Sequence, residues 1–194
     1  MFSLRSLFGT NPDTETARAL YAETIVAARR PEFYTAMEVP DTPEGRFEIL
    51  ALMAFLVLRR LKNETAARKI SQAFFDVMFD DIDSNLRELG VGDISVGKKV
   101  KKLAESFYGR IKAYEEALAA GDDALLCQAL ARHPYRKTEP AERHIARLAR
   151  HVRAEDRHLA GQDVADLLSA RIKFAEIAPD TSLSDDIPTG GGDA

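Results

Sequence analysis

Helical periodicity runs through almost the whole chain and constrains its fold more than any other feature. Apolar residues recur at intervals of three and four, and no segment alternates cleanly between apolar and polar positions, as a half-buried strand does. Long periodic segments with short connections are typical of helices packed against antiparallel neighbours. With 194 residues, the chain is long enough for one hydrophobic core. The sequence therefore predicts an all-α, single compact domain of mostly antiparallel helices.

Capping residues, prolines and glycines mark where the predicted helices begin and end. Asp13 or Thr14 caps the first helix, which stops at Pro31. Thr42 caps the second, with Pro43 in its first turn. Further helices are expected over residues 63–89, from near Gly97 to Gly121, from Asp122 or Asp123 to the His133–Tyr135 stretch, and from Thr138 with Pro140 just inside.

The two ends of the chain differ in composition from the periodic middle. Residues 1–12 begin with a broken apolar stretch and one arginine, which predicts a flexible N-terminus without a signal peptide. Residues 177–194 hold turn-forming residues and a glycine run, which indicates a disordered tail. Residues 13–176 between them form the predicted helical domain.

Composition narrows the classes of function. The net charge of −4 provides no overall attraction to nucleic acid, so a basic site has to be local. The single cysteine, Cys127, excludes an intramolecular disulfide and a cysteine-based zinc site, and it fits a reducing compartment. The longest apolar run, residues 49–58, is far shorter than the roughly 20 residues that span a bilayer. It therefore predicts a buried helix and no transmembrane span.

The stretch GVGDISVGKK, residues 90–99, is close to a phosphate-binding loop. Gly92, Gly97 and Lys98 stand near the required spacing, but Lys99 replaces the Ser or Thr that holds magnesium in such a loop. The preceding segment is helix-periodic, whereas a phosphate-binding loop follows a strand. The sequence therefore argues against nucleotide binding.

Four lysines follow this stretch at the start of the helix expected from residue 97. They are Lys98, Lys99, Lys101 and Lys102. Cations there oppose the helix dipole at a cost of about 0.3–1 kcal/mol each at low salt. Together with exposed backbone N–H groups they form a candidate site for an anionic partner, such as RNA phosphate, lipid head groups or a carboxylate patch. Neutralisation by acidic residues of the same protein is the alternative, and the sequence leaves both open.

Three aspartates share one stripe of the preceding helix, namely Asp76, Asp80 and Asp83, with Arg87 one turn further on. Together with Asp81 they suggest, as an alternative function, a small all-α magnesium-dependent enzyme acting on a prenyl or phospholipid diphosphate-type substrate. Such enzymes need two facing acidic clusters, and no second cluster is found on a helix. We therefore expect no metal site and a solvated acidic face that pairs with Arg87 or with the lysines.

Three histidines, His144, His151 and His158, are spaced by seven residues, and each follows an arginine. Along a helix they lie about 10.5 Å apart, too far for one metal ion, whose ligand pairs need spacings of three or four. We expect a solvated amphipathic helix, with a helix that faces a partner or RNA as the alternative. No set of residues argues for a catalytic site.

Two stretches carry a specific order and spacing of residues: RPEFYTAMEVPDTPEGRFEILALMAFLVLRRLK, residues 30–62, and FFDVMFDDIDSNLRELGVGDISVGKKVKKLAESFYGRIKAYEEAL, residues 74–118. In them the chain resembles the bacterial branch of the ubiquinol–cytochrome c chaperone family, the assembly factors of respiratory complex III. The resemblance covers roughly residues 20–130. From about Glu139 the chain is expected to depart from the family.

The resemblance implies a non-enzymatic chaperone, without cofactors, that binds newly made cytochrome b and promotes assembly of ubiquinol–cytochrome c reductase. It implies a cytoplasmic protein or one peripheral at the inner face of the cytoplasmic membrane. Because mitochondrial members work near the ribosomal exit tunnel, a ribosome surface or anionic lipid is the partner expected for the lysines, without sequence-specific nucleic-acid binding.

A chaperone of a membrane protein also needs an exposed apolar surface. Phe33, Tyr34, Met37 and Phe47 lie in a loop-rich segment between the first two long helices or at its border. They are the candidates for client binding. Core packing between those two helices is the alternative for the same four residues.

Overall fold

The computed structural model describes residues 11–88 and 90–178, and their secondary structure is helical, without a β-strand. The all-α prediction is therefore confirmed for this part of the chain. The chain passes through α1 (Pro12–Ala28), α2 (Glu32–Thr35), α3 (Pro43–Leu61), a 3-10 turn (Thr65–Ala67), α4 (Arg68–Glu88), α5 (Asp93–Ala120), α6 (Asp123–Arg132), α7 (Glu142–Ala160) and α8 (Val164–Leu168).

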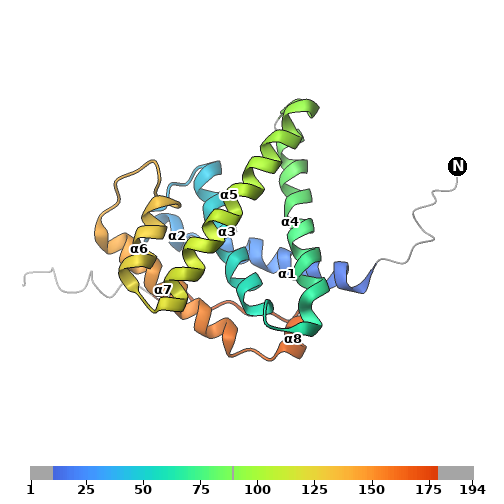
Figure 1. The fold of residues 1–194 in the computed structure, drawn as a ribbon. Coiled ribbons are helices and arrows are strands. Elements are labelled where there is room, and N and C mark those ends of the chain that lie inside the picture. Colours follow the sequence, from blue (N-terminus) through green and yellow to red (C-terminus); the bar gives the residue numbers. More distant parts are fainter. Residues whose placement is uncertain (1–10, 89, 179–194) are drawn as a thin grey trace, which may run out of the picture.

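The long helix α3 runs through the middle of the molecule (Figure 1). It contacts α1, α4, α5 and α7. Residues 51–57 are buried one after another, so this helix is apolar on all sides, as a helix surrounded by protein must be. The predicted burial of the apolar run is confirmed. No helix in the described ranges has the length and apolar content that a bilayer crossing requires.

The start of α3 is built as its sequence predicts. The Thr42 hydroxyl accepts a hydrogen bond from the Gly45 N–H at 3.1 Å, and Pro43 occupies the first turn. Gly45 is buried against the preceding loop, where a Cβ atom would lie 2.0 Å from the Pro40 carbonyl oxygen. Only glycine fits this contact, and it sets the path by which α2 leads into α3.

Two of the other helix ends also agree with the sequence. Gly121 ends α5 in the left-handed conformation, with φ of 67°, which favours glycine. The Asp122 carboxylate accepts hydrogen bonds from two N–H groups in the first turn of α6.

Other predicted boundaries are wrong. The first helix is capped by Asn11, whose side chain accepts from the Asp13 N–H at 3.0 Å, and α4 is preceded by a separate 3-10 turn. The helix α5 begins at Asp93 instead of near Gly97. Thr138 donates its hydroxyl to the Tyr135 carbonyl, so it stabilises a turn and α7 begins only at Glu142.

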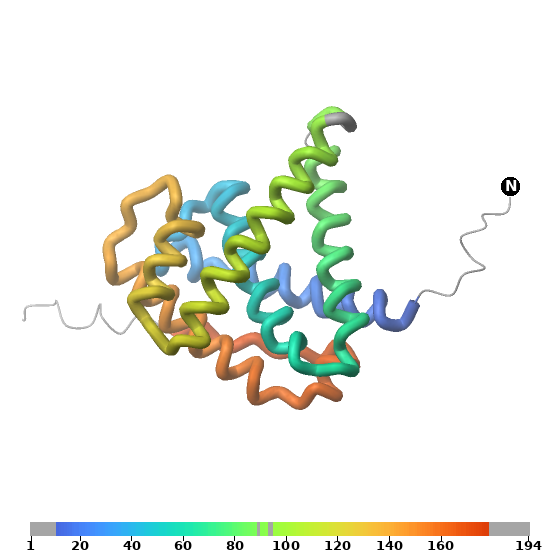
Figure 2. Tube along the Cα trace, viewed as in Figure 1, coloured from blue at the N-terminus to red at the C-terminus, as the bar shows by residue number. Residues whose placement is uncertain are grey.

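Two hydrophobic clusters meet at α3. One joins α3 to α2, α6, α7 and the C-terminal half of α5. The other joins α3 to α1 and α4 and includes Phe107 of α5. The helices α4 and α5 form a hairpin whose joined end projects beyond the rest of the molecule (Figures 1 and 2).

After α8 the chain returns beside α7 without regular secondary structure (Figure 2). We call residues 171–178 the strap. Ile172, Phe174 and Ile177 pack against the core. The Gln162 side chain binds both backbone groups of Lys173, and Arg147 donates to the Ala178 carbonyl at 2.9 Å.

The strap moves one predicted boundary. Ile177 and Ala178 were assigned to the tail, but they belong to the packed structure. Residues 179–194 of the predicted tail and residues 1–10 of the predicted flexible N-terminus lie outside the described residues.

Candidate functional site

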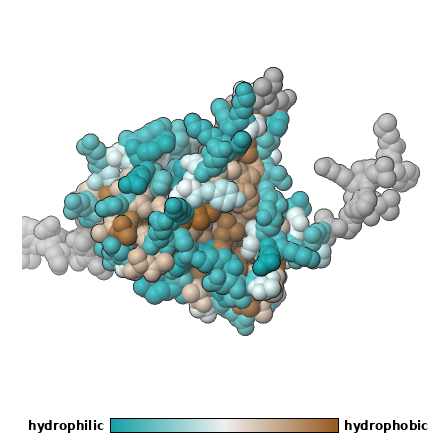
Figure 3. All heavy atoms as spheres, in the orientation of Figure 1, coloured by the Kyte–Doolittle hydropathy of each residue, from teal (hydrophilic) through white to brown (hydrophobic). Residues whose placement is uncertain are grey.

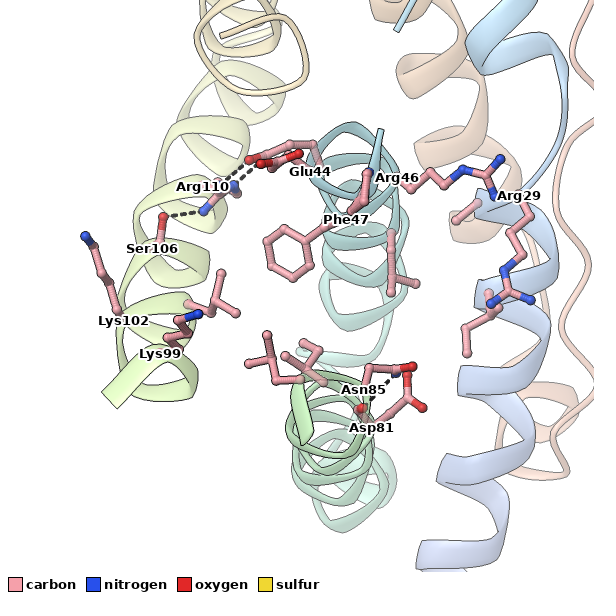
Figure 4. A pocket seen from close by; sticks show the side chains of 18 of the residues that line it. Arg29, Glu44, Arg46, Phe47, Asp81, Asn85, Lys99, Lys102, Ser106 and Arg110 are labelled. Atoms are coloured by element: carbon pink, nitrogen blue, oxygen red, sulfur yellow. Dashed lines mark hydrogen bonds and ion pairs between the residues drawn. The ribbon is translucent and has the colours of Figure 1, made fainter. Parts of the chain in front are cut away.

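A cleft of about 690 Å³ lies between α1, α3, α4 and α5. Figure 4 shows it from close by, with α5 on one side, α1 on the other and Phe47 pointing into the space between them. Its lining comprises Ile25, Ala28, Arg29, Tyr34, Pro43, Glu44, Arg46, Phe47, Glu48, Leu50, Asp81, Ile82, Asn85, Leu86, Lys99, Lys102, Leu103, Ser106, Arg110 and Arg136.

The apolar part of the lining comes from one face of each helix. Residues three or four apart lie on the same side of a helix, so Phe47 with Leu50, and Ile82 with Leu86, point the same way. Leu103 closes this surface from α5. We call these five residues, together with Ile25 and Ala28, the apolar lining. A surface of this kind in a concave site is suited to apolar side chains of another molecule.

Basic side chains outnumber acidic ones around the apolar lining. Six bases, Arg29, Arg46, Lys99, Lys102, Arg110 and Arg136, stand against three acids, Glu44, Glu48 and Asp81. The lining therefore carries a formal excess of three positive charges, although the protein as a whole is acidic.

One basic residue of the cleft is fully engaged within the fold. The Arg110 guanidinium forms two hydrogen bonds with the buried Glu48 carboxylate, the longer at 2.6 Å, and a third with Ser106. It also lies 5.6 Å from the centre of the Phe47 ring. A two-pronged arginine–carboxylate pair of this kind fixes geometry, and here it ties α5 to α3 at the inner end of the cleft.

Four other bases form no such pair. Arg29, Lys99, Lys102 and Arg136 are exposed, and none forms an ion pair with an acidic side chain in the described ranges. Arg46, by contrast, pairs with Asp41 at 2.5 Å. We call Arg29, Lys99, Lys102 and Arg136 the free bases of the cleft. Beside an apolar lining, they suit an occupant that is both anionic and apolar.

The predicted lysine site is partly brought together. Lys99 and Lys102 line the cleft, whereas Lys98 and Lys101 are exposed outside the lining. Because α5 begins at Asp93, the N–H groups from residue 97 onward lie inside the helix, so the expected combination of lysines with free N–H groups is wrong. Of the four lysines, Lys101 alone has an ion-pair partner among the residues that the structure describes, Glu105 at 4.0 Å, and that exposed pair contributes little.

The predicted client-binding residues are divided between core and cleft. Phe33 and Met37 are fully buried, so the core-packing alternative holds for these two. Tyr34 and Phe47 are partly exposed and line the cleft. The Tyr34 hydroxyl donates to the Ala28 carbonyl at 2.9 Å, which holds its ring at the edge of the site.

The predicted acidic face lies outside the cleft. Asp76 accepts a hydrogen bond from Gln72, Asp80 is exposed, and Asp83 pairs with Arg87 at 2.5 Å, as expected. No group of three or more His, Cys, Asp or Glu side chains in the described part of the chain is arranged to hold a metal ion.

Asp81, on the neighbouring stripe of α4, does line the cleft. Its carboxylate accepts a hydrogen bond from the Tyr21 hydroxyl at 2.8 Å. Burial and this bond raise the pKa of Tyr21 far above its usual value, so the bond persists at every physiological pH.

The histidines of α7 correct another expectation. His144 and His151 are buried on the inner face of α7, and only His158 is exposed. The His151 ring packs edge-on against Phe33, with ring centres 5.3 Å apart. The prediction of a solvated helix is wrong for these two residues because their spacing matches the apolar stripe of the same helix, which includes Leu148.

A cluster of ionisable groups lies under the strap, and its members, Arg30, His151 and Glu155, do not line the cleft. The Glu155 carboxylate is fully buried and accepts the Ala175 N–H at 3.0 Å, while Arg30 donates to the Ala175 carbonyl. Burial raises the pKa of Glu155 to about 7. Burial, followed by the charge of Arg30, lowers the pKa of His151 to about 4. Both groups are therefore neutral in the folded protein between these values.

Figure 3 shows apolar side chains between α5 and α4 on the face that it views. Phe75 and Tyr108 belong to these two helices, their ring centres lie 5.5 Å apart, and Tyr108 is 59% exposed. Neither residue lines the cleft. Tyr108 serves below as an exposed position against which the cleft can be tested.

Sequence reasoning missed the opposite walls of the cleft. Arg29 and Arg136 gave no signal, since single basic residues near helix ends are common. Ile82, Leu86 and Leu103 are apolar residues in helix-periodic segments, and such positions are expected in the core from sequence alone. Only the arrangement of the helices shows that these positions border an open space.

Comparisons with known proteins indicate a single family. The family model described as ubiquinol-cytochrome C chaperone matches residues 35–174. A Xenopus laevis protein named ubiquinol-cytochrome-c reductase complex assembly factor 1 is 28% identical over 138 residues, which cover 71% of this chain and 68% of that protein. Its Homo sapiens counterpart is 27% identical over 153 residues, 78% of this chain but only 51% of that protein.

A solved structure is also similar. The protein described as the Cbp3 homolog from Brucella abortus shares 37% identity and a TM-score of 0.78, over 86% of this chain and 92% of that chain. The family match extends to residue 174. The expectation that the chain departs from the family after about residue 139 is therefore wrong.

Proposed function

The chain belongs to the ubiquinol–cytochrome c chaperone family, whose members and relatives indicate an assembly factor of respiratory complex III, and we propose that it binds newly made cytochrome b. The family match carries this proposal, because it includes the whole of α3, α4 and α5, from which most of the cleft is built. In this role the protein promotes assembly of ubiquinol–cytochrome c reductase without catalysing a reaction.

We assign the client to the cleft. Newly made membrane segments expose apolar side chains that must be shielded from water, and the apolar lining offers such shielding. Phe47 contributes an aromatic ring to the apolar lining, and Tyr34 adds another at the edge of the cleft. The free bases at its edge favour a client segment with acidic residues beside the apolar ones.

The lysines outside the lining have a separate proposed role. Lys98 and Lys101 are exposed near the projecting end of the α4–α5 hairpin. We propose that they contact an anionic surface, of the ribosome or of lipid, while the protein works at the inner face of the cytoplasmic membrane. Charged contacts of this kind are long-ranged and weaken with salt.

The enzyme alternative has less support. Its three aspartates, Asp76, Asp80 and Asp83, lie outside the cleft, and two of them are already engaged by neighbours on the same helix. A magnesium-dependent reaction at this face predicts binding heat for Mg²⁺ that disappears in Asp80→Ala.

The proposed function is tested by crosslinking in cells. A photoreactive residue is placed at Phe47 or Leu86 in the cleft, and at Val26 or Tyr108 as exposed control positions outside it. Cytochrome b should be captured from the cleft positions only, and a deletion strain should lose assembled complex III. Normal complex III in that strain, or equal capture from the control positions, would contradict the proposal.

A further inference from the structure

The cleft needs an anionic and apolar occupant, and one such segment belongs to the chain itself. Residues 179–194 contain four aspartates, Asp180, Asp185, Asp186 and Asp193, and no lysine or arginine. Leu183 and Ile187 stand on either side of the Asp185–Asp186 pair. This pattern of acids beside aliphatic residues complements free bases beside an apolar lining.

The strap contacts the chain just after α1, beside one of the free bases of the cleft. Arg30 donates to the Ala175 carbonyl, and its chain neighbour Arg29 is one of the free bases of the cleft. Arg147 then holds the Ala178 carbonyl. Seven residues lead from Ala178 to Asp185, and an extended chain spans about 3.3–3.6 Å per residue, so the aspartate pair can reach roughly 25 Å from the end of the strap.

The other end of the chain lacks this complementarity. Residues 1–10 contain apolar side chains but also Arg5, and they include no acidic residue. The free bases therefore repel that segment, whereas they attract residues 179–194.

We propose that residues 179–194 bind in the cleft of their own chain, with the Asp185–Asp186 pair against the free bases and Leu183 or Ile187 against the apolar lining. The segment thereby covers the apolar surface while no client is present. Its effect on client access rests on the proposed function, whereas its binding to the cleft does not.

The tether makes a weak contact sufficient. A segment joined through a short linker meets its site at an effective concentration in the millimolar range, so a few charged and apolar contacts keep the cleft covered. A client with more apolar surface displaces it without needing exceptional affinity. Because the contact depends on charge, it weakens as salt rises.

Paramagnetic broadening in the full chain tests the contact directly. Cys127→Ser removes the native thiol, and a nitroxide is attached at Ser184→Cys. Methyl signals of Leu86 and Leu103 in the cleft should broaden, whereas those of Leu167, in α8, should not. The broadening should disappear when Asp180, Asp185 and Asp186 are changed to Asn, and in high salt.

A charge exchange gives the sharpest control. Lys99→Glu with Lys102→Glu should abolish the broadening, and adding Asp185→Lys with Asp186→Lys should restore it. Lys101→Glu with Lys112→Glu changes the same number of charges on α5 outside the cleft and should leave the broadening intact.

Two results would overturn the proposal. One is unaffected cleft signals at low salt; the other is broadening only between spin-labelled and isotope-labelled copies, which would identify a second molecule as the occupant. Failure of the proposed function can be told apart from failure of this inference. If the cleft signals broaden but the deletion strain has normal complex III, only the proposed client role is wrong. If cytochrome b is captured at the cleft positions but the cleft signals do not broaden, only this inference is wrong.

Dye binding tests whether residues 179–194 cover the apolar lining. The dye 8-anilinonaphthalene-1-sulfonate is anionic and apolar, and it serves as a probe of the open cleft. The triple Asp→Asn variant should bind it about threefold more tightly or better, because the competing segment is released. Weaker dye binding by Lys99→Glu would show that the dye binds in the cleft. If the triple variant then binds the dye no more tightly than the wild-type protein does, the segment does not cover the apolar lining.

Discussion

The strap side of the molecule and the cleft differ in whether their polar side chains have partners within the fold. Under the strap, the buried Glu155 carboxylate and the Arg30 guanidinium each bind a backbone group of Ala175. In the cleft, Lys99 and Lys102 have no acidic partner among the described residues. Buried polar groups must be satisfied within the fold, whereas exposed charges are solvated at little cost. The first region therefore holds the fold together, and the second is available for recognition.

The buried ion pair at the inner end of the cleft gives the largest expected effect, because it tests whether that end belongs with the structural region. Arg110→Leu leaves the Glu48 carboxylate buried without its partner and should lower the free energy of unfolding by about 3–5 kcal/mol in urea denaturation. Glu48→Leu with Arg110→Leu should recover most of this loss. Lys112→Leu, which removes an exposed pair beginning two residues further along α5, is the matched control and should stay within about 0.5 kcal/mol. A loss below about 1 kcal/mol for Arg110→Leu would place the pair with the recognition surface.

Leucine truncation compares the two regions directly. Leu148 is fully buried in α7, and its change to Ala should cost about 2–5 kcal/mol. Leu103 is half-buried in the cleft, so Leu103→Ala should cost only about 1 kcal/mol, which reflects its smaller loss of buried apolar area. Equal losses in chemical denaturation would show that the cleft is packed as tightly as the core.

The pair of buried titratable residues predicts how stability depends on pH. The raised pKa of Glu155, about 7 against an ordinary 4.5, means that the folded state holds a proton that the unfolded state releases, so this group makes stability fall as pH rises from about 4.5 to 7. The lowered pKa of His151, about 4 against 6.5, makes stability rise over about pH 4 to 6.5. The two effects oppose each other in the wild-type protein.

Single variants should separate these effects. In His151→Asn the free energy of unfolding should fall with pH by up to about 1.4 kcal/mol per unit between pH 4.5 and 7. In Glu155→Gln it should rise by a similar amount between pH 4 and 6.5. The exposed His158→Asn is the control, with the pH profile of the wild type. Parallel profiles for all three variants would show that the strap region does not couple folding to protonation.

The smallest change in stability, and the one most specific to recognition, is expected for the free bases. Lys99→Gln with Lys102→Gln should change the free energy of unfolding by no more than about 0.5 kcal/mol, because neither lysine has a partner in the fold. The same variant should lower the amount of assembled complex III in cells. Lys69→Gln with Lys112→Gln, which removes two exposed charges outside the cleft, should not, and equal effects of both pairs would argue that overall charge matters instead of the cleft.

Local patterns explain why much of the architecture could be read in advance. The Thr42–Pro43 start of α3, the Gly121 end of α5 and the Asp122 cap depend on residues within one helical turn, so the sequence displays them completely. Errors arose where two local signals competed. Thr138 has the residue type of a helix cap, but its hydroxyl stabilises a turn. The glycines before the lysines favour a loop, although α5 already begins at Asp93.

The candidate site could be predicted from the sequence only in part. Tyr34, Phe47, Lys99 and Lys102 were named from the sequence and all line the cleft, but Phe33 and Met37, equally apolar and adjacent in sequence, are core residues. Neighbouring residues on a short helix point in different directions, and which direction faces the core depends on what packs against it.

The order of the residues thus carried the helical class, the helix ends at Thr42, Gly121 and Asp122, and the family to which the chain belongs. The cleft came from the fold: Arg29 follows the end of α1, Leu86 and Leu103 lie on the two helices of the α4–α5 hairpin, and Arg136 lies in a loop. Periodicity reports contacts between residues three or four positions apart, whereas a concave site depends on how whole helices cross and where their packing leaves space. For that reason an apolar position that walls a cleft and one that fills a core look the same until the helices are assembled.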